Sequence, residues 1–166
     1  MKVLKIIASL IAMLLLLSLF FGCNTEREYS GKDIESIEYY TVNFMGGGAY
    51  YQKMLLNSGE IYKKHYLPYD EGNSTEYQLT CTFDASKKDE IINKFYNIGI
   101  LELEEKYRTD DLVMDGGSWH LIIQYADGTE KTSRGINAGP THLFTDCDQA
   151  FFDITGVSFW GRVRDN

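Results

Sequence analysis

The spacing of apolar residues changes along this chain, and that change constrains the fold more than any other feature of the sequence. In residues 34–83 and 119–134, apolar and aromatic side chains alternate with polar ones, as in half-buried strands. In residues 91–98 and 143–154 they recur every three to four positions, as in a helix with one apolar side. Such a helix must bury its stripe against another layer. The pattern therefore predicts an α+β domain in which helices lie on a sheet.

Turn residues divide the alternating regions into six predicted strands. They span residues 34–44, 49–56, 60–67, 75–83, 119–125 and 129–134. Asp127-Gly128 between the last two is a strong hairpin signal. With one helix after the fourth strand and one after the sixth, the order is ββββαββα. We expect a mainly antiparallel sheet with both helices on one face.

The helix boundaries have their own signals. Ser86 to Asp89 resembles a capping box, which predicts where the first helix starts. Gly99 and Gly156 follow the two apolar stripes and are expected to end the helices, because glycine tolerates the left-handed conformation of a helix end.

Two cysteines are expected to point into the layer between sheet and helices. Alternation places Cys81 on one face of the fourth strand with Tyr77, Leu79 and Phe83, and Cys147 lies on the apolar stripe of the second helix. A disulfide is chemically allowed if the two Cα atoms come within about 7 Å. The alternative is two buried thiols that act as small apolar side chains.

The N-terminus has the order of an export signal. Two lysines precede an apolar run that ends at Gly22-Cys23, and this run is shorter than the roughly 20 residues of a spanning helix. We expect residues 1–22 to be a signal peptide and Cys23 to be the lipidated first residue of the mature chain. Two acyl chains on Cys23 would suffice for stable attachment. The expected location is therefore the cell membrane, lipid-anchored at its extracytoplasmic face.

The remainder divides simply. Residues 24–32 are polar and charged, so residues 23–33 are expected to form a polar tether. Residues 34–160 are expected to be a single α+β domain, followed by a tail at 161–166.

Two segments resemble bacterial lipoproteins. Gly22-Cys23 is similar to the lipobox of that class. The segment from Asp115 onward resembles part of uncharacterised members: an aromatic-led strand, a D-G hairpin, a return strand and G-x-N-A-x-P. In this sequence the second motif comprises Trp119, Asp127, Gly128, Gly135, Asn137, Ala138 and Pro140. The resemblance implies a domain of unknown function on an exported chain, and it carries no catalytic residue.

Charge excludes one class of partner. The chain has 24 acidic and 16 basic residues and a formal net charge of −8, and removal of residues 1–22 would take away two of the lysines. A nucleic-acid-binding surface needs the opposite sign. We therefore expect no nucleic-acid partner.

Candidate metal and catalytic groups are sparse. Asp110, Asp111 and Asp115 with His120 lack the regular spacing of a calcium loop, and a solvated loop explains them better. The histidines at 65, 120 and 142 do not have zinc-motif spacing. We expect no metal and no cofactor. An acid pair such as Asp111 and Asp115 leaves open an envelope hydrolase directed at glycans.

The 12 tyrosines are the most suggestive feature for function. Adjacent pairs occur on consecutive predicted strands, so one ring of each pair must point away from the core. The sequence predicts that Tyr40, Tyr51 and Tyr62 form an aromatic platform that binds an envelope protein or glycan. The alternative is ordinary cross-strand pairing. We therefore expect a membrane-anchored binding module without catalysis, with the hydrolase and a passive structural lipoprotein as alternatives.

Overall fold

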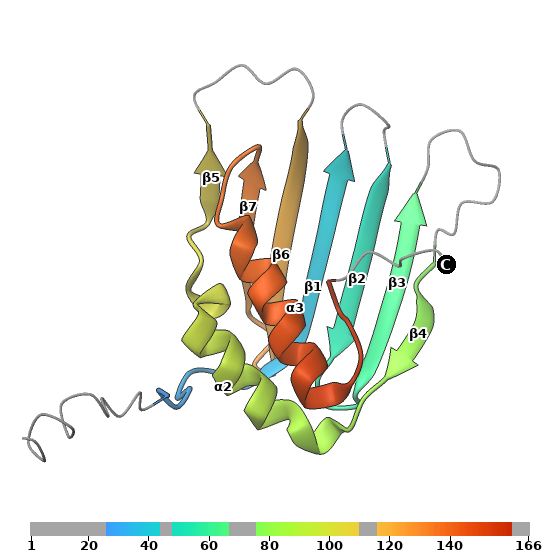
Figure 1. Cartoon of the computed structure of the whole chain (residues 1–166), viewed down its shortest axis with the longest axis vertical. Helices are drawn as coiled ribbons and strands as arrows, with labels where there is room; N and C mark the ends of the chain where they lie inside the picture. Colours follow the sequence, from blue (N-terminus) through green and yellow to red (C-terminus); the bar gives the residue numbers. More distant parts are fainter. Residues whose placement is uncertain (1–25, 44–47, 67–75, 110–115, 161–166) are drawn as a thin grey trace, which may run out of the picture.

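The computed structural model describes residues 26–43, 48–66, 76–109 and 116–160. The elements in chain order are β1 (Ile34–Asn43), β2 (Ala49–Leu55), β3 (Glu60–Tyr66), β4 (Gln78–Thr82), η1 (Ala85–Lys87), α2 (Lys88–Ile98), η2 (Ile100–Glu102), β5 (Lys106–Arg108), β6 (Gly117–Tyr125), β7 (Glu130–Ile136) and α3 (Thr141–Thr155). The predicted α+β class is confirmed (Figure 1).

The strands form one mixed sheet in the order β4-β3-β2-β1-β6-β7-β5. All pairings are antiparallel except β5 with β7, which is parallel. The prediction of six antiparallel strands was therefore wrong by one strand. The added strand, β5, has only three residues, which is too short to show an alternating pattern.

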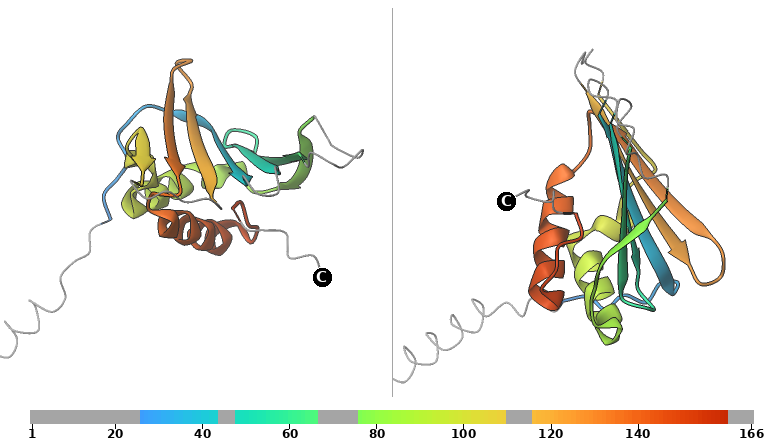
Figure 2. Two further views of the ribbon diagram at one scale, coloured as in Figure 1. Left: turned by 90° about the horizontal axis from the view of Figure 1, so that it is seen from above. Right: turned by 90° about the vertical axis from the view of Figure 1, so that its right-hand side faces the viewer.

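Both helices lie on the same face of the sheet, as Figure 2 shows in its right-hand view. The core fills the space between them and the sheet. Fully buried side chains come from the strands, for example Ile37, Met54 and Ile123, and from the helices, for example Phe95 and Phe151. The helix-covered face is thus the hydrophobic side of the domain. The opposite face, here called the open face, is covered by none of the helices in the described part of the chain.

A bulge in the β3–β4 pairing corrects the prediction for the fourth strand. Ile61 pairs with Cys81, but the next residue, Tyr62, pairs with Leu79, so Thr80 is an extra residue in β4. The alternation is broken there. Cys81 stays on the helix side, whereas the side chain of Leu79 is 53% exposed. The four residues predicted to share one face therefore do not.

The predicted capping box was also wrong. Asp84 is the cap: its carboxylate accepts a hydrogen bond from the backbone N–H of Ser86 at 2.9 Å and starts the short helix η1, which leads into α2. The predicted ends are confirmed, because Gly99 (φ 98°) and Gly156 (φ 76°) follow α2 and α3 in the left-handed conformation.

The two cysteines are free thiols in the structure, so the disulfide considered from the sequence is not formed in it. Cys147 is fully buried on α3, and burial raises the pKa of its thiol far above the usual range. Cys81 is half-buried on β4. Cys147 therefore acts as a small apolar side chain, as the alternative predicted.

The described part of the predicted tether is attached to α2. The backbone N–H of Tyr29 donates to Asn93 Oδ1 at 2.7 Å, and its ring packs edge-on against Tyr96. Arg27 exchanges hydrogen bonds with Asn97, and Glu26 pairs with Lys94. Residues 26–29 thus lie along the helix instead of standing free of the domain.

Candidate functional site: the open face of the sheet

Two layers of aromatic residues identify the two faces of the sheet. Tyr39 on β1 and Trp119 on β6 contact Phe144 of α3, with ring centroids 4.8 and 5.0 Å apart. Because successive side chains in a strand point to opposite faces, Tyr40 and His120 lie on the open face. Figure 2 shows that face without a covering helix.

Five side chains from five adjacent strands line up across the open face. Strand register pairs Lys64 with Tyr51, Tyr51 with Tyr40, Tyr40 with His120, and His120 with Arg134. Residues in register share a face, so these five residues form a continuous row, here called the cross-strand row. They come from β3, β2, β1, β6 and β7.

The rings of the cross-strand row stack face to face. The Tyr40 and His120 ring centroids are 4.2 Å apart with an interplanar angle of 8°, and those of Tyr40 and Tyr51 are 5.0 Å apart at 27°. Side chains stand roughly perpendicular to a sheet, and neighbouring strands lie about 4.8 Å apart, which explains this packing. The ring faces are therefore occupied by each other, and only the edges and polar tips are directed to solvent.

Cations lie at both ends of the row. The Lys64 ammonium lies over the Tyr51 ring at 4.4 Å and over the Tyr77 ring at 4.7 Å. Tyr77 is held in turn, because its hydroxyl donates to Glu38 Oε1 at 2.6 Å. Arg134 stands next to His120 at the other end. Lys64 is thus positioned by two rings before any ligand arrives.

The electrostatics keep the centre of the row neutral at pH 7. Burial raises the pKa of Tyr40, and the neighbouring Tyr51 and Glu38 raise it further. Burial lowers the pKa of His120, and Arg134 lowers it further because two adjacent cations repel. The phenol of Tyr40 therefore remains a hydrogen-bond donor, and the imidazole of His120 is uncharged.

The structure brings two of the three predicted tyrosines together. Tyr40 and Tyr51 are neighbours in the cross-strand row. Tyr62 lies on the same face of β3, but it pairs with Lys53 and Leu79 and so belongs to the next row. A flat platform of three rings is not what the strands form. The three rings point outward as predicted, but their predicted arrangement as one platform was wrong.

Three members of the cross-strand row, namely Lys64, His120 and Arg134, were not predicted from the sequence. Lys64 and Arg134 alternate with inward residues of their strands, so their face could have been derived from the pattern. His120 joins the tyrosines only because β1 pairs with β6, a contact between segments about 80 residues apart in the chain. Nothing in the local pattern of either strand specifies that pairing.

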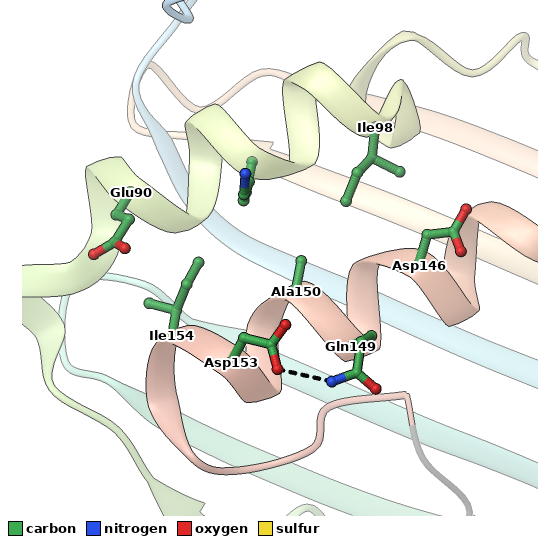
Figure 3. A pocket seen from close by; sticks show the side chains of 8 residues that line it. Glu90, Ile98, Asp146, Gln149, Ala150, Asp153 and Ile154 are labelled. Carbon is green, nitrogen blue, oxygen red and sulfur yellow. Dashed lines mark hydrogen bonds between the residues drawn. The ribbon is translucent and has the colours of Figure 1, made fainter. Parts of the chain in front are cut away.

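A shallow groove lies between the two helices (Figure 3). Its lining residues are Glu90, Lys94, Ile98, Asp146, Gln149, Ala150, Asp153 and Ile154. The side chain of Gln149 donates to Asp153 at 2.8 Å across one turn of α3. The groove is shallow and its polar groups are solvated, so it offers no enclosed site for chemistry.

Several sequence predictions concern residues outside the described ranges. These are the predicted lipidation of Cys23 and the acid cluster of Asp110, Asp111 and Asp115. In the described part of the chain, no group of three or more His, Cys, Asp or Glu side chains is arranged to hold a metal ion. Among those same residues, no helix is long and apolar enough to span a bilayer.

Comparison with protein-family models, with curated proteins and with solved structures finds no match for this chain. The open face itself is therefore the feature from which a function can be inferred.

Proposed function

We propose that this protein is a lipid-anchored binding module of the extracytoplasmic membrane face and that it captures its ligand with the open face of its sheet. The observation that carries this proposal is the cross-strand row. Five strands of a helix-backed sheet present one aligned series of polar and cationic tips to solvent. This arrangement can bind, but it lacks an enclosed pocket in which a reaction could be shielded from water.

The orientation of the N-terminal segment supports the same function. Residues 26–29 are attached to α2, and only two residues separate Glu26 from Cys23. Those residues can extend over roughly 10 Å at most. A lipid on Cys23 would therefore hold the domain close to the membrane by its helix side, and the open face would remain available to ligands of the envelope.

The membrane attachment is tested by replacing Cys23. In the producing bacterium, the Cys23→Ser variant should lose incorporation of labelled fatty acid and leave the membrane fraction. The control is Cys81→Ser, which should stay lipidated and membrane-bound. Fatty-acid labelling that persists in Cys23→Ser would contradict the anchor.

The binding role is tested by crosslinking in intact cells. A photo-reactive residue is placed at Thr132 on the open face, or at Gln149 on the exposed surface of α3. We expect a specific adduct from Thr132 that disappears when Tyr40 and Tyr51 are replaced by alanine, and no equivalent adduct from Gln149. The proposal also requires that the Tyr40→Ala/Tyr51→Ala variant remains folded, as judged by its melting temperature. Equal crosslinking from both positions would overturn it.

A further inference from the structure

On the open face, the acidic side chains have hydrogen-bond partners, whereas two basic side chains form no ion pair among the described residues. Its three glutamates all accept hydrogen bonds from neighbouring side chains: Glu38 from Tyr77, Glu60 from Ser58 and Glu130 from Gln124. In contrast, neither Lys64 nor Arg134 forms an ion pair with a carboxylate in the described part of the chain. On an otherwise acidic protein, this face leaves its cations available to an external anion.

The cations are separated by a fixed distance. Lys64 and Arg134 lie four strands apart, so their backbones are roughly 19 Å from each other at the usual strand spacing. Between them lie the tips of Tyr51, Tyr40 and His120. Among the described residues, the hydroxyls of Tyr40 and Tyr51 have no hydrogen-bond partner. A complementary ligand therefore has anionic groups that reach both cations and a hydroxyl-rich stretch between them.

From this complementarity we infer that the ligand of the open face is an acidic polysaccharide that lies across the strands, with carboxylates of separate sugar units on Lys64 and Arg134. Arginine suits a carboxylate because it can form two parallel hydrogen bonds with it. The hydroxyls of the sugar units between these two carboxylates meet the tips of Tyr51, Tyr40 and His120. This inference rests on the proposed binding function and names the chemistry of its ligand.

Two other ligands fit the row less well. An extended peptide is usually bound by adding a strand to a sheet edge, where its backbone finds hydrogen-bond partners, and the cross-strand row lies on a face. Residues 27 and 29 are attached to α2, and the open face is on the other side of the sheet (Figure 2), so an anionic membrane would have to approach from the side opposite to this N-terminal segment.

The stacking changes what the tyrosines contribute. A platform that bound sugars by ring stacking would need free ring faces, but in the row these faces cover one another. Recognition must therefore use the hydroxyl tips. Replacing Tyr40 and Tyr51 by phenylalanine, which keeps the rings and removes the hydroxyls, should weaken binding, whereas a stacking platform would tolerate the change.

The test uses the full-length chain, purified in detergent, and measures its affinity for hyaluronan, in which a uronate alternates with a neutral amino sugar. The same polymer with its carboxylates reduced to alcohols is the matched ligand control. We expect salt-sensitive binding to hyaluronan and at least tenfold weaker binding to the reduced polymer. Lys64→Gln and Arg134→Gln should each weaken binding about tenfold, and the Tyr40→Phe/Tyr51→Phe variant should weaken it severalfold. Lys87→Gln, on the helix side, should have no effect.

The outcomes separate the inference from the function beneath it. Three results would overturn the inference that the ligand is an acidic polysaccharide. They are equal binding of both polymers, no binding of either, and preferential binding of polyglutamate or of phosphatidylglycerol vesicles. If crosslinking from Thr132 still depends on Tyr40 and Tyr51 in those cases, the binding function stands with another ligand. Loss of that crosslink dependence would remove both.

Discussion

The two faces of the sheet use aromatic residues in opposite ways. On the helix side, rings meet at steep angles, as in the edge-on contact of Phe83 with Phe151 at 81°, and fill the core. On the open face, Tyr40 and His120 are almost parallel and stack on each other within the row. Edge-on contacts let each ring pack against several others in the core, whereas parallel stacking aligns the rings in one row across the strands. The core rings should therefore determine stability, and the row should determine recognition.

The largest expected effect is on the helix side. Phe151 is fully buried and contacts Phe83, Phe95 and Phe159. Phe151→Ala should lower the free energy of unfolding by about 3–5 kcal/mol, because it removes apolar contact and leaves a cavity. The matched control is Phe152→Ala, whose side chain is 51% exposed and should cost well under 1 kcal/mol. Urea denaturation of the two variants measures the difference, and similar losses would contradict the assignment of the faces.

A smaller loss is expected where the chain after α3 is fastened to the core. Asp148 accepts hydrogen bonds from the backbone N–H groups of Phe159 and Trp160 at 2.7 and 2.8 Å, and from the Ser158 hydroxyl. Asp148→Ala removes the acceptor of the Phe159 and Trp160 N–H groups and should cost about 2 kcal/mol. Trp160 provides the readout: it is half-buried with its indole Nε1 shielded from solvent, and its fluorescence should shift toward that of solvent-exposed tryptophan. Asp146→Ala, an exposed position on the same helix, is the control.

The sequence predicted the local structure of this fold better than its long-range contacts. Alternation located β1, β2 and β3 to within a residue or two, and glycine located both helix ends, because these features depend on neighbouring residues. The bulge at Thr80 and the parallel strand β5 depend on partners far along the chain. For the same reason, the outward tyrosines could be predicted, but their junction with His120 could not.

A moderate effect is expected from the pairing of Tyr40 and Tyr51. Each alanine substitution should lower stability by about 1 kcal/mol, and the double variant should show a coupling of roughly 0.5–1 kcal/mol, since stacked rings on neighbouring strands interact. Tyr62 belongs to the adjacent row, so Tyr62→Ala combined with Tyr40→Ala should be additive. Chemical denaturation of the two cycles measures both values. Strong coupling between Tyr40 and Tyr62 would show that the open face packs as a platform and not as separate rows.

The smallest effect is a pH dependence that originates in the row. The pKa of His120 lies below its ordinary 6.5, first because burial disfavours the imidazolium and then because Arg134 repels it. The unfolded chain therefore takes up the proton more readily than the folded chain. Stability is retained above pH 6.5 and lost as the pH falls through the folded pKa.

This dependence can be isolated with two variants. Between pH 7.5 and 5.5, His120→Gln should lose a few degrees less in melting temperature than the wild type, and Arg134→Gln should lie between them because only the repulsion is removed. Tyr40, which faces His120 from β1, stays protonated over this range, and Glu38 beside it is the same in all three proteins. An anion bound to Arg134 should reduce the difference in melting-temperature loss between the wild type and His120→Gln, because it offsets the charge that opposes protonation of His120. An equal loss of melting temperature in all three proteins would show that burial and Arg134 do not lower the pKa of His120.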